Sequence, residues 1–414
     1  MIKAQKHLPK SLALLKWGLV LLTCLLVGCA STPKKGYKNY LYEGNIPEAE
    51  NILNGINANN DKLLREVQLA SIAQLKSDFK SSNNHLETGK KLAEELAAIS
   101  VTETLAAISI NQRVSKFSGN RFERIMIYFN KALNYIASND AAAARIEISQ
   151  AEILMQEWRI GVERFPFIPL FLALIYEKIG DIENSLVAYR RAAAAYKSSE
   201  STPDILKKGY LQLLAKYGRQ SELARASLQL KAKVAASPNK ASLIIVVPRG
   251  FMTPMDSFTV YNFHPEINKN FLIALPLYSE YSGVRAAPLL SLKQQAKDSA
   301  NVIFENMVNV ELGMRAALKR QMPAITTLAL ARAVVKSQLQ QQTAENSAAS
   351  FLVFVFNTVT EVADTRSWDT LPQAFYFSRL ELDPGSYSLN YADREPMNVS
   401  IKKGVNFLFL PNYR

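Results

Sequence analysis

Five short turn signals at nearly regular intervals constrain the fold of the first half of the chain. Each separates two stretches of helical periodicity. They are Gly44-Asn45, Asn83-Asn84, Asn139-Asp140, Gly180-Asp181 and Gly218-Arg219. Successive signals lie 39, 56, 41 and 38 residues apart, and three of these spacings are near the length of one helix pair. Glycine ends a helix in the left-handed conformation at no Cβ cost, and Asn or Asp can begin the next helix. The spacing predicts consecutive helix pairs over residues 36–236, with an extra helix near residues 90–115.

The fourth helix pair, residues 169–192, resembles a tetratricopeptide repeat. It has small residues where the two helices would approach closely, and aromatic or small residues at the family's packing spacings. These residues are Ala173, Tyr176, Ser185, Tyr189 and Ala192. Residues 127–144 and 37–53 are looser copies of the same pattern. The resemblance implies a curved solenoid whose concave face binds peptides or partner helices, while the pattern residues themselves pack in its core.

A break at residues 237–240 marks a change of periodicity. The sequence therefore predicts a tetratricopeptide-like helical region, residues 36–236, followed by a mixed α/β region, residues 241–414. Short β-branched or alternating runs predict the first strands of the second region. They are residues 243–247, 257–263 and 271–276, of which the first is expected to be buried and the second exposed.

The rest of the second region predicts a helix and then an antiparallel tail. The helix is expected from about residue 290 to residue 342, with a break near Pro323, because proline disfavours helix in the residue before it. Residues 351–356 are too few to cross a bilayer and predict a buried strand or the start of a buried helix. Turns at Pro384-Gly385 and Lys403-Gly404 are typical of hairpins between the last strands. These strands are residues 380–382, 387–391, 397–401 and 405–410.

Residues 1–28 are typical of a bacterial secretory signal. A basic segment with Lys3, Lys6 and Lys10 leads into an apolar run at residues 17–27, which is shorter than the roughly 20 residues of a membrane-spanning helix. The run ends in residues 26–29 (LVGC), which resemble the bacterial lipobox. The alternative is a plain signal peptide with an accidental cysteine.

The lipobox resemblance implies cleavage before Cys29, with diacylglycerol on its sulfur and a further acyl chain on its new amine. More than one acyl chain is needed for stable anchoring, so a triacylated Cys29 would hold the protein firmly on a membrane. Ala30 after the cysteine implies the outer membrane. Residues 29–35 would then be a lipidated linker, and we expect the mature protein on the periplasmic face.

Scarce residue types exclude most common catalytic and cofactor-binding motifs. The 16 glycines form neither G-x-G-x-x-G nor a P-loop, and the chain has no C-x-x-C, H-E-x-x-H or G-x-S-x-G. His85 and His264 lie in different regions and cannot alone make a metal site. The net charge of +13 is spread along the chain, whereas a nucleic-acid binder concentrates it in a patch or tail. We therefore expect no cofactor, no metal, no nucleic acid and no enzymatic activity.

Several segments resemble a family of bacterial lipoproteins that joins tetratricopeptide-like repeats to a conserved C-terminal domain. They are residues 124–135, 273–278, 322–336 and, above all, 363–372 (ADTRSWDTLP). The family brings no established activity or catalytic residues, so none is carried over. Its members are associated with an outer-membrane lipoprotein activator of a peptidoglycan synthase, which implies a role in the cell envelope.

Residues 364–369 are the first candidate for an interaction surface. Arg366 could bind a carboxylate or phosphate, and Trp368 could stack on a sugar or anchor a partner. Asp364 and Asp369 would complete this surface. The structural alternative, which we favour, is that an Asp364–Arg366 pair fixes a loop while Trp368 fills the core.

Basic residues of the predicted helix are the second candidate. Arg332 and Lys336, like Arg315 and Lys319, are four residues apart, which places each pair on one helical face. Arg332 and Lys336 could meet lipid phosphates, an anionic glycan or an acidic partner. The alternative is an ordinary solvated face.

Three functions fit these features. The first is a non-enzymatic scaffold anchored in the outer membrane, whose repeats recruit a periplasmic protein. The second is a regulator of peptidoglycan synthesis that binds a synthase or its activator. The third is an enzyme that acts on glycan through Asp364 and Asp369, which would both have to lie in one open cleft.

Overall fold

The computed structural model describes most of the chain after residue 35. The described residues are 36–56, 59–98, 115–198, 202–234, 239–264, 269–294, 300–342, 362–391, 395–411 and 413. The expected signal peptide, Cys29, residues 351–356 and most of the expected extra helix lie outside them. The chain divides into two compact units, Met1–Ile52 and Leu53–Arg414.

The described part of the first unit contains α2 (Tyr37–Glu43) and most of α3 (Ile46–Asn54). Gly44 between them has a φ of 81°, in the left-handed region, and its N–H donates to the carbonyl of Leu41. A residue with a Cβ is strained in this conformation, so glycine suits this helix end. The turn predicted at Gly44-Asn45 is confirmed.

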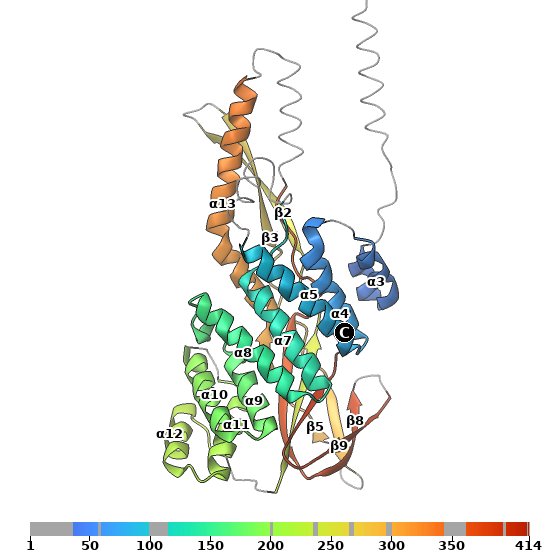
Figure 1. The fold of residues 1–414 in the computed structure, drawn as a ribbon, viewed down its shortest axis with the longest axis vertical. Coiled ribbons are helices and arrows are strands. Elements are labelled where there is room, and N and C mark those ends of the chain that lie inside the picture. Colours follow the sequence, from blue (N-terminus) through green and yellow to red (C-terminus); the bar gives the residue numbers. More distant parts are fainter. Residues whose placement is uncertain are drawn as a thin grey trace, which may run out of the picture. The chain divides into compact units, whose positions relative to one another are not determined.

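The second unit begins with a series of helices (Figure 1). They are η1 (Asn59–Asp61), α4 (Lys62–Leu75), α5 (Phe79–Ala98), α7 (Arg121–Ala137), α8 (Ala141–Glu157), η3 (Val162–Arg164), α9 (Phe167–Ile179), α10 (Ile182–Ala195), η4 (Tyr196–Ser198), α11 (Asp204–Lys216) and α12 (Gln220–Leu230). Helix α4 packs against α5, α7 against α8, α9 against α10, and α11 against α12. The described helices from α4 to α12 are therefore arranged as packed pairs.

Three predicted turns fall between paired helices, and one does not. Asn139, Gly180 and Gly218 have φ values of 60°, 82° and 68°, and each follows the first helix of its pair. The turn predicted at Asn83-Asn84 is wrong, because both residues lie inside α5. The chain turns instead near Asp78, whose carboxylate accepts a hydrogen bond from the N–H of Ser81 in the first turn of α5.

The strands that follow form two four-stranded sheets and a two-stranded ribbon. They are β1 (Ala241–Arg249), β2 (Met255–His264), β3 (Lys269–Tyr278), β4 (Leu290–Gln294), β5 (Ala300–Asn301), β6 (Glu305–Asn309), β7 (Ala374–Leu382), β8 (Gly385–Tyr391), β9 (Met397–Ile401) and β10 (Val405–Phe409). The first sheet has the order β10-β1-β7-β6 and the second β5-β4-β8-β9, while β2 and β3 pair separately. The β1–β10 pair is parallel, and the other pairs are antiparallel. The chain is therefore of mixed class, with helices first and sheets later.

Strand β1 lies at the centre of the structure because both of its faces are covered. Ile244 and Val246 belong to the core shared with the helices, whereas Leu243 and Ile245 belong to a second core shared with the β4–β8 sheet. Successive side chains of a strand point to opposite faces, so β1 separates a helical layer from a second sheet. The buried strand predicted at residues 243–247 is confirmed.

The first helix of three pairs faces the first sheet. Helices α7 and α9 contact β10, and α11 contacts β7. The ring of Phe129 in α7 lies 5.2 Å from that of Phe375, and the ring of Phe171 in α9 lies 6.0 Å from that of Phe377. Aromatic pairs at these separations add to the stability gained from burial. The chain's own sheet therefore covers the inner side of these helices.

Two expectations for the C-terminal region are corrected. Helix α13 (Val310–Gln342) begins 20 residues later than predicted, because residues from 290 on form β4, β5 and β6, and it continues through Pro323 without ending. Neither predicted turn closes a hairpin, because β7 and β8 belong to different sheets, and so do β9 and β10; the consecutive strands that do pair are β8 and β9. A turn signal shows where the chain reverses but not which sheet the next strand joins.

Helix α13 runs along the β2–β3 ribbon (Figure 1). Ala329 and Ala333 of the helix pack against Ile273 of β3. These contacts offset the backbone hydrogen bond lost at Pro323. None of the described helices combines the length and apolarity that crossing a membrane requires.

Candidate functional site

Arg366 holds together three separate parts of the chain. Its guanidinium forms two hydrogen bonds to Asp364, of 2.8 and 2.7 Å, and one of 2.8 Å to Asp61. It also donates to the carbonyl of Ser115 over 2.9 Å. Only 6% of the side chain is exposed. The Asp364–Arg366 pair therefore fixes a loop, as the structural alternative predicts.

Trp368 is a core residue, with 1% of its surface exposed. Its indole N–H donates to Oγ of Ser71 over 2.9 Å, and its backbone N–H donates to the carboxylate of Glu123 over 2.7 Å. Both polar groups are thus satisfied inside the protein. The preference for a core role of Trp368 is confirmed.

Glu123 is a buried carboxylate that the sequence interpretation missed. Its other oxygen accepts a hydrogen bond of 2.7 Å from the N–H of Asn120, and Asn120 caps α7 in return. Burial raises the pKa of Glu123 to about 7, although the hydrogen bonds from Trp368 and Asn120 oppose this shift. The spacing of Asn120 and Glu123 is that of a capping box and was visible in the sequence.

Asp364 and Asp369 differ in their surroundings within the described part of the chain. Asp364 lines a cavity of about 300 Å³ together with Arg366 and Glu123, and Asp369 is not among the described residues that line it. Asp369 accepts a hydrogen bond of 3.2 Å from the amide of Gln68. The glycan-acting hypothesis needs both carboxylates in one open cleft, and this cavity contains the carboxylate of Asp364 alone of the two.

Arg332 and Lys336 lie on the covered side of α13. They are 0% and 6% exposed, and with Ala329 and Ala333 they follow the i, i+3, i+4, i+7 spacing of one helical face. The two alanines turn that face toward β3, so the expected solvated face is wrong here. An exposed interaction surface therefore does not include Arg332, Lys336 or Trp368, whereas a binding role for Asp364 or Asp369 stays a prediction.

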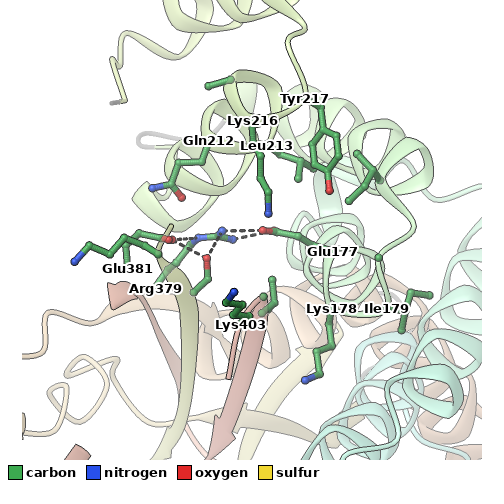
Figure 2. A pocket seen from close by; sticks show the side chains of 17 residues that line it. Glu177, Lys178, Ile179, Gln212, Leu213, Lys216, Tyr217, Arg379, Glu381 and Lys403 are labelled. Carbon is green, nitrogen blue, oxygen red and sulfur yellow. Dashed lines mark hydrogen bonds and ion pairs between the residues drawn. The ribbon is translucent and has the colours of Figure 1, made fainter. Parts of the chain in front are cut away.

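A basic cavity of about 480 Å³ lies where the helical layer meets the first sheet (Figure 2). At its base Arg379, 3% exposed, forms two hydrogen bonds of 2.9 and 2.8 Å to Glu177 and one of 3.0 Å to Glu381. Figure 2 shows Lys216 and Lys403 on either side of the Arg379–Glu177 pair in this view. Lysines therefore line this cavity, while its two glutamates, Glu177 and Glu381, are already paired with Arg379.

The sequence interpretation missed this cavity because its residues come from distant parts of the chain. Lys216 ends α11, Arg379 belongs to β7, and Lys403 follows β9. No local spacing relates these positions. Only the packing of helices on the sheet brings them together.

Exposed apolar side chains mark the outer helices. Ile146 and Ile153 of α8 are 47% and 53% exposed, and Val187 of α10 is 47% exposed. The two isoleucines are seven residues apart and therefore share one helical face. An ion pair of 2.8 Å between Arg191 and Glu152 joins α10 to α8. We call Ile146, Ile153 and Val187 the outer apolar surface.

The comparisons with known proteins give no assignment. No protein-family model matches the chain, and no curated protein matches it. The functional inference therefore depends on the chain's own residues.

Proposed function

We propose that the chain is a lipoprotein of the bacterial outer membrane that acts on the periplasmic face as a protein-interaction scaffold, without catalysis. The lipobox at residues 26–29 supports the anchor and the location. The buried hydrogen-bonding groups around Arg366 and Trp368 support a structural rather than catalytic role for the motif at residues 363–372.

We propose further that the helix pairs are tetratricopeptide-like repeats of a solenoid. The succession of packed pairs from α7 to α12 supports this interpretation. So does the close approach of α9 and α10, where Oγ of Ser185 donates to the carbonyl of Ala173 over 2.9 Å and both residues are fully buried. In this arrangement the inner side packs on the sheet, so a partner would bind the outer side.

The observation that carries the proposal is the outer apolar surface. Ile146, Ile153 and Val187 expose about half of their surface on α8 and α10, whereas the main helix contacts with the first sheet come from α7, α9 and α11. Ile146 and Ile153 share one helical face, and exposed apolar groups on one face are typical of protein-binding surfaces. The Arg191–Glu152 pair keeps the two helices that bear them in register.

The test is partner recovery from cross-linked cells that produce the full-length protein. The double substitution Ile146→Glu/Ile153→Glu should abolish recovery of the partner, because two charges would have to be desolvated in the interface. Leu289→Glu/Ile303→Glu is the matched control, since Leu289 and Ile303 are 88% and 83% exposed elsewhere. Equal recovery with both double variants would contradict the proposal.

The anchor is tested separately with Cys29→Ser. The variant should remain unprocessed and lose its acyl chains, whereas Cys24→Ser should be processed normally. A Cys29→Ser protein of mature size in the outer membrane would refute the anchor. Mass spectrometry of the recovered partner would also decide whether it is a peptidoglycan synthase or its activator, as the family resemblance implies.

A further inference from the structure

The basic cavity continues into a second one. A neighbouring cavity of about 280 Å³ is lined by Lys178 and Lys402, together with polar groups of Asn139, Ser400 and Asn406. Lys178 lines both cavities, and in Figure 2 its side chain points away from Arg379. The two cavities are therefore adjacent, with Lys216 and Lys403 at the first and Lys178 and Lys402 at the second.

These four lysines lack carboxylate partners. None of them forms an ion pair with an acidic group in the described parts of the chain. The acidic groups nearby are engaged: Glu177 and Glu381 bind Arg379, and Asp383 binds Lys240 with two contacts of 2.8 Å. An excess of positive charge therefore remains around the two cavities.

The helix dipole explains why two of these four positions are basic, but not the other two. Lys178 and Lys216 lie in the last turns of α9 and α11, where the helix dipole favours a cation. Lys402 and Lys403 lie in the turn between β9 and β10 and have no such reason to be basic. Burial and the nearby charge of Lys402 lower the pKa of Lys178, so the charge of Lys178 is disfavoured in the free protein.

We propose that the two cavities form one binding site for a ligand that carries two or more phosphate or carboxylate groups. One acidic group would meet Lys216 and Lys403, and another would meet Lys178 and Lys402. Such a ligand would supply the negative charge that Lys178 and Lys402 lack, and a volume of about 480 Å³ in the first cavity leaves room for an organic part. A soluble polyanion and a phosphate-bearing lipid headgroup share this chemistry. The site is independent of the outer apolar surface.

The first test is calorimetric titration of the full-length protein in detergent with pyrophosphate and with citrate. Lys216→Gln/Lys403→Gln and Lys178→Gln/Lys402→Gln should each weaken binding by about tenfold, and the quadruple variant should not bind. The control carries Lys80→Gln, Lys208→Gln, Lys233→Gln and Lys319→Gln, which remove the same charge from exposed positions outside both cavities. The control should bind as the unaltered protein does. Equal affinities of the control and the quadruple variant would overturn the proposal.

The second test needs no variant. Acetic anhydride labels accessible lysines, and bound pyrophosphate should slow the labelling of Lys178, Lys216, Lys402 and Lys403 but not of Lys208. Uniform labelling with and without pyrophosphate would overturn the site. Phosphatidylglycerol vesicles that displace pyrophosphate, when phosphatidylcholine vesicles do not, would assign the site to a lipid headgroup. Lack of displacement alongside pyrophosphate binding would assign it to a soluble ligand.

Discussion

The indole N–H of Trp368 and Oγ of Ser71 form a hydrogen bond of 2.9 Å between residues 297 positions apart. Ser71 lies in α4, and its hydroxyl also donates to the carbonyl of Val67. Trp368 lies in the loop before β7 and belongs to the core shared by helices and sheet. The bond therefore ties the beginning of the helical layer to the C-terminal part of the chain.

Trp368→Ala should lower the free energy of unfolding by about 3–5 kcal/mol, because it leaves a large cavity in the core. Ser71→Ala should lower it by about 1–3 kcal/mol, since the buried indole N–H would lose its partner. Denaturant titration measures both. A loss for Trp368→Ala no larger than that of Ser71→Ala would mean that the indole contributes little by packing.

Glu123 should make stability depend on pH near neutrality. Its pKa is raised in the folded protein from 4.5 to about 7, so between these values the folded state binds more protons than the unfolded state. Stability should therefore fall by about 3 kcal/mol as the pH rises from about 4.5 to about 7. Glu123→Gln, which cannot ionise, should remove this fall. Denaturant titrations at about pH 5 and about pH 7.5 compare the two proteins, and identical pH dependence would contradict the assignment.

Gly180 should tolerate few substitutions, although space is available beside it. Its φ is 82°, and a Cβ added there would meet nothing within 4 Å. Gly180→Val should therefore destabilise only through backbone strain, by about 1–2 kcal/mol. Gly180→Asn should cost less, because Asn adopts the left-handed conformation more readily. Equal thermal stability of both variants would contradict the prediction that the left-handed backbone at Gly180 strains a β-branched residue.

The turns that the sequence predicts correctly depend on local chemistry. Gly44, Asn139, Gly180 and Gly218 adopt positive φ as their residue types suggest. The turn predicted at Asn83 is wrong because Asn83 lies inside α5. Its side chain accepts a hydrogen bond of 2.9 Å from the buried amide of Asn134 in α7. A polar residue inside a helix and one at its start look alike in a sequence.

The sequence could predict the burial of Trp368 but not which residues contact the motif around it. The motif around Arg366 indicated a fixed loop, and the loop is fixed, yet two of its anchors are Asp61 and the carbonyl of Ser115. The basic cavity depends likewise on contacts between α9, α11 and the first sheet. Periodicity identifies which face of an element is apolar, but it does not identify the element that covers that face.

Two arginine–glutamate pairs show how burial changes the contribution of an ion pair to stability. Arg379 and Glu177 form two hydrogen bonds of 2.9 and 2.8 Å, and their side chains are 3% and 9% exposed. Arg190 and Glu222 also form two, of 2.6 and 2.8 Å, but Arg190 is 46% exposed. The two-bond geometry is similar, but Arg379 is far more buried and also donates to Glu381 and to Oγ of Ser242, so we expect it to contribute more than Arg190.

Arg379→Met should lower the free energy of unfolding by about 3–5 kcal/mol, because it leaves Glu177 buried without its counter-charge. Adding Glu177→Gln should restore part of this loss, since the only carboxylate of the pair network that then lacks Arg379 is Glu381, which is 21% exposed to solvent. Arg190→Met should cost less than about 1 kcal/mol, because solvent screens the Arg190–Glu222 pair. Denaturant titration of the three variants measures these differences. Similar losses for Arg379→Met and Arg190→Met would mean that water reaches Glu177 and that the base of the basic cavity is open.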